Sequence, residues 1–275
     1  LTELENYGFF FTQPDLLDVK SKAWLRHYFE EHIYPVVTPL AVDSGHPFPF
    51  LTNHTINAIV RIFQILPDGT KDYKIAILPI PSVLDRIIEI PSRSNKEHRF
   101  VYLEDVITYY ANQFFQGYGI EDYMVFRITR DADLEIDEEE ATDLLSEVEE
   151  SLRRRRRGDA VRLEVCGDVK GHLLDFVLTS VELEQKDVYR IDGHLDCRMY
   201  FDFCNYPGLD ELRYEPFDSK IPSELVDHEG ESLFSIIGKQ DLFVHHPFES
   251  FTVVEQFIAQ AAVDPDVLAI KQTLY

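Results

Sequence analysis

Two adjacent histidines, His245 and His246, lie between segments whose patterns predict a strand and a helix. The apolar run at 241–245 predicts the strand, and the periodic pattern at 250–262 predicts the helix. In α/β structures anions collect at the carboxyl ends of strands and at helix N-termini, where free N–H groups and the helix dipole favour negative charge. We therefore predict an anion site that includes His245, His246 and Ser250.

Lys271 is a further candidate for this site. It lies near the end of a second predicted strand, 266–274, where its ammonium group could face the same cleft. Because adjacent residues on a strand point to opposite faces, at most one of the two histidines can face the site directly. The alternative is structural: one histidine packs, the other lies in a loop, and Ser250 only caps the helix. The residue types alone leave both interpretations open.

Five consecutive arginines form a dense cluster of positive charge. They follow a segment, 131–150, in which eleven of the twenty residues are acidic. Guanidinium groups form bidentate bonds with phosphate oxygens, so the cluster could bind a polyanion. The alternative, which the sequence favours, is a solvated helix end, because early acids and late cations both stabilise the helix dipole. The residues are Arg153, Arg154, Arg155, Arg156 and Arg157.

The elements expected to position these residues alternate between helices and short strands. Helices are predicted at 15–32, 104–116, 131–157 and 172–181, and strands at 38–43, 55–64, 72–78, 99–103, 123–129, 161–165 and 187–191. The first three strands are expected to share one sheet. This order predicts an α+β domain over residues 1–205.

The periodic pattern ends at about residue 206, where prolines, glycines and scattered charges begin. Residues 206–239 are therefore predicted to connect two domains. Residues 240–275 are predicted to begin the second domain, with the order strand, helix, strand. That order is the β-α-β opening of an α/β domain.

The net charge of −24 restricts the possible partners. Non-specific binding of nucleic acid needs a basic face, so we expect none, and any anion site must be local. No apolar run reaches the roughly 20 residues of a transmembrane helix. The three widely spaced cysteines predict neither a disulfide framework nor a zinc site, which indicates a reducing, cytoplasmic location.

Several common catalytic motifs are missing from the sequence. It has no G-x-x-x-x-G-K-[ST] and no G-x-G-x-x-G, which excludes a P-loop nucleotidase. It also has no H-E-x-x-H and no G-x-S-x-G, which excludes the usual metalloprotease and α/β-hydrolase sites. The chain begins at Leu1 and ends at Tyr275 inside a predicted strand, so we expect an internal part of a longer protein.

Five segments resemble polyphosphate kinases of the histidine-phosphorylating type, and the resemblance runs over almost the whole chain. They are TPLAVDSGHPFPFLTN (38–53), FRITRDADLEIDEEEATDL (126–144), RRRGDAVRLEV (155–165), DLFVHHPFESF (241–251) and DPDVLAIKQTLY (264–275). The resemblance implies that 1–205 is the α+β head domain of such an enzyme. It implies that 240–275 is the first β-α-β of a phospholipase D-like α/β catalytic domain.

The resemblance also implies an activity: reversible transfer of the terminal phosphate of ATP to inorganic polyphosphate through a phosphohistidine, with magnesium. A homo-oligomer formed through the head domain and a cytoplasmic enzyme, peripheral at the membrane at most, are further implications.

By the same resemblance, no catalytic or metal-binding residue is expected within the chain. The acceptor histidine of the family lies in a His-Ala-Lys motif, which this sequence lacks, and the metal-binding arginine directly follows the run that ends at Tyr275. We therefore expect the chain alone to be inactive. The alternatives are a non-catalytic dimerisation or scaffold module, and a phospholipase D-type diesterase, which would require an H-x-K-x4-D repeat.

Overall fold

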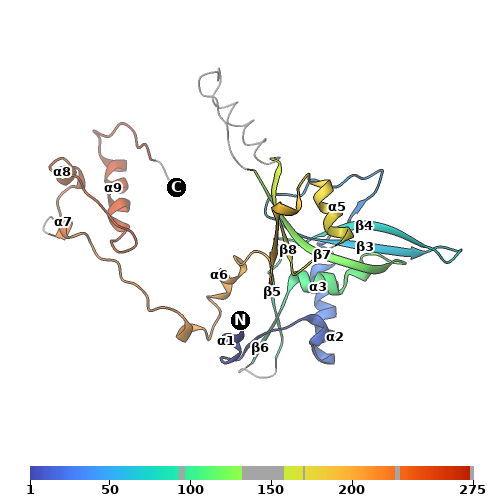
Figure 1. The fold of residues 1–275 in the computed structure, drawn as a ribbon. Helices are drawn as coiled ribbons and strands as arrows, with labels where there is room; N and C mark the ends of the chain where they lie inside the picture. Colours follow the sequence, from blue (N-terminus) through green and yellow to red (C-terminus); the bar gives the residue numbers. More distant parts are fainter. Residues whose placement is uncertain (93–96, 132–157, 170, 227–229, 273–275) are drawn as a thin grey trace, which may run out of the picture. The chain divides into compact units, whose positions relative to one another are not determined.

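The computed structural model divides the chain into two compact units, Leu1–Tyr206 (unit 1) and Pro207–Tyr275 (unit 2) (Figure 1). It describes residues 1–92, 97–131, 158–169, 171–226, 230–272. The arginine cluster and the predicted helix 131–157 lie outside these residues, apart from Asp131. None of the helices among the described residues is both long and apolar enough to cross a bilayer.

A six-stranded sheet forms the centre of unit 1. Its order is β2 (Leu40–Val42), β4 (Lys71–Pro79), β3 (Ile56–Ile65), β7 (Gly119–Arg130), β8 (Ala160–Cys166), β9 (Val188–Ile191). All neighbours are antiparallel except β8 and β9, which are parallel. The prediction that the first three strands share one sheet is confirmed, and the unit has the mixed α and β content that the sequence predicts.

The hairpin of β3 and β4 is set by its turn. Asp68 Oδ1 accepts the N–H of Thr70 at 3.0 Å, and Gly69 adopts a φ of 85° that favours glycine. The pairing then runs from Ile65 opposite Lys71 to Asn57 opposite Pro79. Because β3 also pairs with β7 along its other side, it is an inner strand of the sheet (Figure 1).

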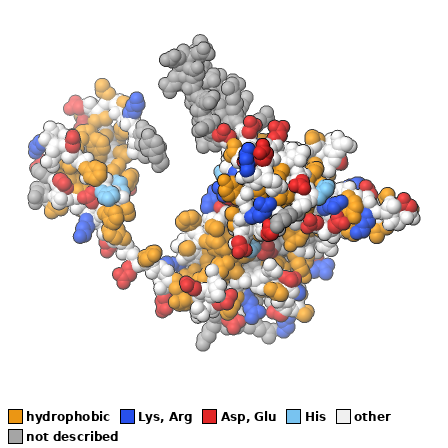
Figure 2. Space-filling model, in the orientation of Figure 1, with side chains coloured by type: hydrophobic (Ala, Val, Ile, Leu, Met, Phe, Trp, Pro, Cys, Tyr) orange, Lys and Arg blue, Asp and Glu red, His pale blue; other side chains and the backbone are white. Residues whose placement is uncertain are grey.

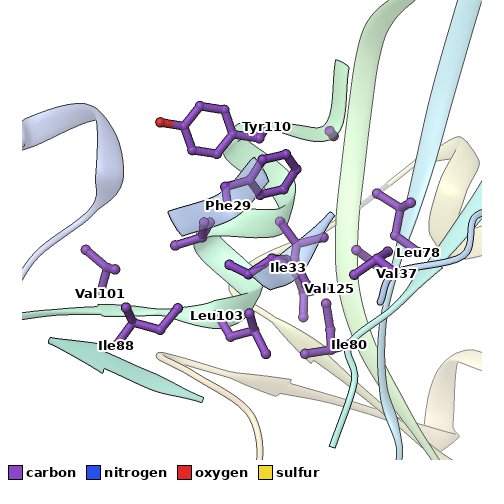
Figure 3. Close-up of a cluster of buried hydrophobic side chains, with 14 of the residues drawn as sticks. Phe29, Ile33, Val37, Leu78, Ile80, Ile88, Val101, Leu103, Tyr110 and Val125 are labelled. Atoms are coloured by element: carbon purple, nitrogen blue, oxygen red, sulfur yellow. The ribbon is translucent and has the colours of Figure 1, made fainter. Parts of the chain in front are cut away.

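Helices cover both faces of this sheet. Alternate residues of β3 point to opposite faces, so Ala58, Val60 and Ile62 enter one core cluster while Ile59 enters the other. The first cluster packs under α2 (Val19–Tyr28), η2 (Phe29–Ile33) and α3 (Leu103–Tyr109), as Figure 3 shows in part. The second packs under α5 (His172–Ser180). The result is a helix, sheet, helix arrangement.

A small sheet extends unit 1 at its N-terminal side. Its order is β1 (Phe9–Phe11), β6 (His98–Tyr102), β5 (Ile87–Ile90). Short elements complete the unit: α1 (Thr2–Glu5), η1 (Pro14–Leu16), η3 (Ala111–Gln113), η4 (Gln185–Asp187), α6 (Met199–Phe203). The rings of β1 and β6 pack against α6, for example Phe11 on Phe203 at a centroid distance of 5.1 Å. Aromatic contacts therefore attach the end of unit 1 to its beginning.

A buried ion pair ties these parts together. The carboxylate of Glu104, whose side chain is 2% exposed, pairs with the guanidinium of Arg86. Arg86 also donates to the carbonyl oxygens of Leu195 and Asp196, both at 2.9 Å. Because a buried carboxylate is costly unless it is paired and hydrogen-bonded, these contacts hold α3, the start of β5 and the 193–198 loop in one arrangement.

Asp196 carries the next link of the network. Its carboxylate accepts hydrogen bonds from the Arg198 side chain at 2.6 and 2.7 Å and lies 3.3 Å from Arg127 Nη1. Arg127 on β7 also pairs with Glu164 on β8. The loop is thereby connected to the centre of the large sheet.

Unit 2 differs from the prediction in its strands. It contains η5 (Asp210–Leu212), α7 (Ser223–Val226), α8 (Leu233–Ile237) and α9 (Thr252–Val263), and α9 confirms the helix expected at 250–262. The strands predicted at 241–245 and 266–274 are wrong for the described residues, which are extended or irregular there. A strand needs a neighbour for its backbone hydrogen bonds, and the described part of unit 2 offers one isolated bridge, Lys220 with Glu249. The β-α-β opening is therefore not formed within residues 230–272.

The segment 206–239, predicted to be a connection, also contributes to a core. Leu233 and Ile236 of α8 are buried against Val253 of α9. The Gln260 side chain of α9 accepts the N–H of Leu233 at 2.9 Å. Thus α8 belongs to the packed part of unit 2.

Replacement of Arg86 tests the buried pair. We expect Arg86→Met to lower the free energy of unfolding by about 3–5 kcal/mol, because it leaves Glu104 buried and unpaired. The control is Arg26→Met, which removes an exposed pair between Arg26 on α2 and Glu30 on η2 and should change the stability far less, because a solvent-exposed ion pair contributes little. Urea unfolding followed by circular dichroism measures both; equal losses would contradict the role of Arg86.

The Asp196 carboxyl predicts a specific acid sensitivity. Hydrogen bonds from the Arg198 side chain, then from the Arg198 backbone, and the charge of Arg127 lower the pKa of Asp196 from 3.8 to about 2, against the opposing effect of burial. A lowered folded-state pKa stabilises the fold above pH 3.8, and this contribution is lost as the pH falls towards 2. The wild-type advantage over Asp196→Asn in unfolding free energy should therefore shrink by about 2 kcal/mol between pH 6 and pH 2. A pH-independent difference would contradict it.

Candidate functional site

The turn at 245–250 of unit 2 carries three of the four anion-site candidates, and its own residues close it. The N–H of Glu249 donates to His245 O at 2.9 Å, and the N–H of His245 donates to Glu249 Oε2 at 2.8 Å. The His246–Pro247 peptide bond in the turn is cis. These contacts fix the backbone of the turn while its histidine side chains stay exposed.

The two histidines differ in their partners. The ring of His245 lies against that of Phe248, with centroids 5.0 Å apart. His246 Nδ1 lies 2.9 Å from Glu249 O, and a carbonyl oxygen only accepts, so Nδ1 carries the proton of this bond. In the neutral ring Nε2 then has a free lone pair. Figure 2 shows histidine side chains among hydrophobic ones on the surface of unit 2.

Ser250 lies at the start of α9. Its hydroxyl oxygen accepts the N–H of Thr252 at 3.2 Å and lies 2.8 Å from the Thr252 hydroxyl. The N-cap residue of α9 is Phe251, one position later. Ser250 is therefore not the N-cap that the structural alternative expected, although its hydroxyl contacts the first residue of the helix.

Lys220 is a functional candidate that sequence reasoning missed. Its N–H donates to Phe248 O at 3.0 Å, and its carbonyl oxygen accepts the N–H of Ser250 at 2.8 Å. The side chain is exposed, and no carboxylate among the described residues lies within ion-pair distance, 4.0 Å, of its ammonium group. No local pattern marks Lys220, because only the fold pairs its backbone with Phe248 and Ser250 of the turn.

The other candidates are not brought to this turn. Lys271 is exposed in an irregular segment, and the structure shows no contact between its side chain and the turn within the described residues. Arg153 to Arg157 lie outside those residues. The described part of the chain also has no group of three or more His, Cys, Asp or Glu that could hold a metal ion.

The turn therefore combines a lysine, two exposed imidazoles and the first turn of α9. Lysine and protonated histidine are donors, and the N-terminal N–H groups of a twelve-residue helix favour anions. Glu249 opposes this charge, but one of its oxygens already accepts the N–H of His245. The arrangement can bind phosphate oxygens by hydrogen bonds and charge.

Comparison with known families gives two matches. The family model described as Polyphosphate kinase middle domain matches residues 20–203, and that described as Polyphosphate kinase C-terminal domain 1 matches residues 232–275. The first match covers most of unit 1 and the second covers the turn and α9.

Curated relatives and a solved structure agree with these matches. A polyphosphate kinase of Pseudomonas syringae pv. tomato is 40% identical over 276 residues, which is 100% of this chain and 37% of the relative. One of Halalkalibacterium halodurans is 42% identical over 99% of this chain and 38% of the relative. The crystal structure of polyphosphate kinase from Porphyromonas gingivalis has a TM-score of 0.71 at 22% identity, over 97% of this chain and 37% of that chain. The similarity to that structure shows the fold.

Proposed function

The chain belongs to the polyphosphate kinase family, and on this premise we propose that it is part of an enzyme that transfers the terminal phosphate of ATP reversibly to inorganic polyphosphate. The family match over 184 residues supports the proposal, since 20–203 is more than half of the chain. The chain spans less than 40% of the length of the two relatives described above.

The proposed chemistry is a two-step transfer through a histidine. An imidazole nitrogen attacks the γ-phosphorus of ATP, the bond to the β–γ bridging oxygen breaks, and ADP leaves. A terminal oxygen of polyphosphate then attacks the phosphohistidine, which frees the imidazole and lengthens the chain by one phosphate. A sequence without a P-loop is compatible with this route, because a histidine nucleophile and positioned cations can stabilise the transferred phosphate.

Magnesium remains part of the proposal through the family resemblance alone. Among the described residues, no group of three or more His, Cys, Asp or Glu lies together as a metal site would require, and magnesium is therefore not assigned to particular residues of this chain. No step assigned to this chain depends on the ion.

The single observation that supports a role for this chain is the turn at 245–250 with Lys220 beside it. We propose that Lys220, His245 and His246 bind phosphate groups of the polyphosphate chain or of ATP. Lys271 and the cluster Arg153–Arg157 stay predictions, as does Ser250 as a phosphate ligand. In an overall acidic protein such a local set of donors is what a polyanion requires.

The chain alone is proposed to be inactive. It covers less than 40% of the length of each of the two relatives, and it lacks a His-Ala-Lys motif. Both observations support an acceptor histidine elsewhere in the enzyme. The phospholipase D-like architecture around residues 240–275 and self-association through unit 1 remain predictions of the family resemblance. In the alternative of a non-catalytic dimerisation or scaffold module, unit 1 would be the functional part.

The activity is tested with the complete reading frame that contains these 275 residues. We expect the complete protein to form acid-insoluble polyphosphate from ATP labelled at the γ-phosphate and to carry acid-labile label on a histidine. The 275-residue chain should do neither. Failure of the complete protein to make polyphosphate would refute the proposed function, and clear activity of the short chain would refute its inactivity.

The role of Lys220 is tested by polyphosphate binding to the chain. We expect Lys220→Ala to weaken binding severalfold and to lower the slope of log affinity against log salt by roughly 0.7, the value for one lost contact to a single-stranded polyanion. The matched control is Lys239→Ala in the same unit, because Lys239 already pairs with Glu231 at 3.2 Å. Isothermal titration at several salt concentrations measures both, and equal effects of the two variants would exclude Lys220.

A further inference from the structure

A pocket of unit 1 lies between the helical segments α2, η2, α3 and η3. Its volume is about 740 Å³, within the range of small-molecule sites in proteins. The lining comprises tyrosine rings, side-chain amides and one ion pair: Arg26, Glu30, Tyr34, Tyr109, Tyr110, Asn112, Gln113 and Gln116. No histidine, cysteine or aspartate lines it, so its chemistry is recognition and not acid, base or metal catalysis.

The tyrosines offer flat surfaces that the core leaves uncovered. The Tyr34 ring stacks on Phe114 with a centroid distance of 5.2 Å and an angle of 18°, and it remains 41% exposed. Tyr109 is 43% exposed and stands edge-on to Tyr110. Tyr110 is itself buried on Phe29, as Figure 3 shows, and gives the pocket a rigid base. Two half-exposed rings on fixed neighbours suit the stacking of a planar ligand.

The amides supply donors and acceptors without partners of their own. Among the described residues, nothing hydrogen-bonds to the side chains of Asn112, Gln113 or Gln116. Each amide presents an oxygen that accepts and a nitrogen that donates. Asparagine and glutamine match the adjacent donor and acceptor of an adenine edge in this way.

Arg26 provides the cation of the pocket. Its Nε donates to Glu30 Oε1 at 2.9 Å, and this hydrogen bond, together with the negative charge of the carboxylate, raises the pKa of Arg26. Its terminal nitrogens have no partner among the described residues and can donate to phosphate. Glu30 offsets the charge of Arg26, and the protein carries a net charge of −24. Arg26 alone would therefore bind a polyanion without a nucleobase only weakly. Stacking and amide contacts must supply most of the affinity.

We propose that this pocket binds a purine nucleotide, with the base on the exposed tyrosine rings, its polar edge on the amides and its phosphate near Arg26. The proposal goes beyond the phosphate transfer and does not rest on it. It assigns to unit 1 a ligand site built from the helices that cover the large sheet.

Binding is tested with the 275-residue chain by isothermal titration and by saturation-transfer NMR of ADP. We expect the adenine H2 and H8 protons to receive saturation, and an excess of tripolyphosphate to leave most of that signal. Tyr109→Ala should weaken ADP binding roughly tenfold or more, as expected for the loss of one stacking contact. Asn112→Ala is a second change, at an exposed residue whose side chain makes no hydrogen bond to the described residues, and it should weaken binding with little effect on the fold.

Matched controls lie far from the pocket in sequence. Tyr214→Ala removes a fully exposed tyrosine of unit 2, and Gln64→Ala an exposed amide of β3, and both should bind ADP as the wild type does. The proposal is overturned if ADP does not bind, if tripolyphosphate displaces it completely, or if the pocket variants bind like the controls. Circular dichroism melting of each variant shows whether it is folded. If Tyr109→Ala does not fold, the ADP affinity of Asn112→Ala decides whether the pocket binds the nucleotide.

Discussion

Unit 1 depends on the constraint that a buried carboxylate must be paired. Glu104 lies in the first turn of α3 inside the core, where an unpaired charge would cost several kcal/mol. Arg86 meets this constraint and, with its remaining donors, binds two carbonyl oxygens about a hundred residues later in the chain. Since a guanidinium is planar and its donors are fixed in direction, the 193–198 loop has one position relative to α3. Arg86 therefore joins the end of unit 1 to α3.

The 193–198 loop connects to the large sheet in one direction and to α6 in the other. Asp196 extends the network to Arg127 and so to Glu164, which joins neighbouring strands of the large sheet. In the other direction the loop leads into α6, whose rings pack on β1 and β6, and Tyr102 and Tyr200 share a hydrogen bond of 2.5 Å. Ionic contacts thus set the path of the chain, and aromatic contacts hold its end at the N-terminal sheet. The helices above the sheet frame the pocket.

Unit 2 is organised by a different principle. Its core consists of a few side chains of α8 and α9, and its phosphate candidates lie on a turn closed by local hydrogen bonds. The backbone of the turn is fixed, while Lys220 and the histidine rings remain exposed. Such an arrangement can present cations to a polyanion without the cost of burying them. The functional candidates of unit 2 are therefore exposed side chains, and the two imidazoles among them also make local contacts, His245 with Phe248 and His246 with Glu249 O.

Local patterns in the sequence determined most helices and strands of unit 1, and they also indicated the family. The apolar run of β3, the turn at Asp68 and Gly69, and α9 all follow from contacts between residues close in sequence, where periodicity is informative. Tertiary structure alone decided the partner of Glu104, the place of Lys220, the pocket between α2 and α3, and the absence of the strand expected at 241–245. Each of these depends on a neighbour far away in the chain or on its absence among the described residues. The physical reason is that hydrogen bonds and ion pairs need a partner in space, and a local pattern specifies only which groups require one.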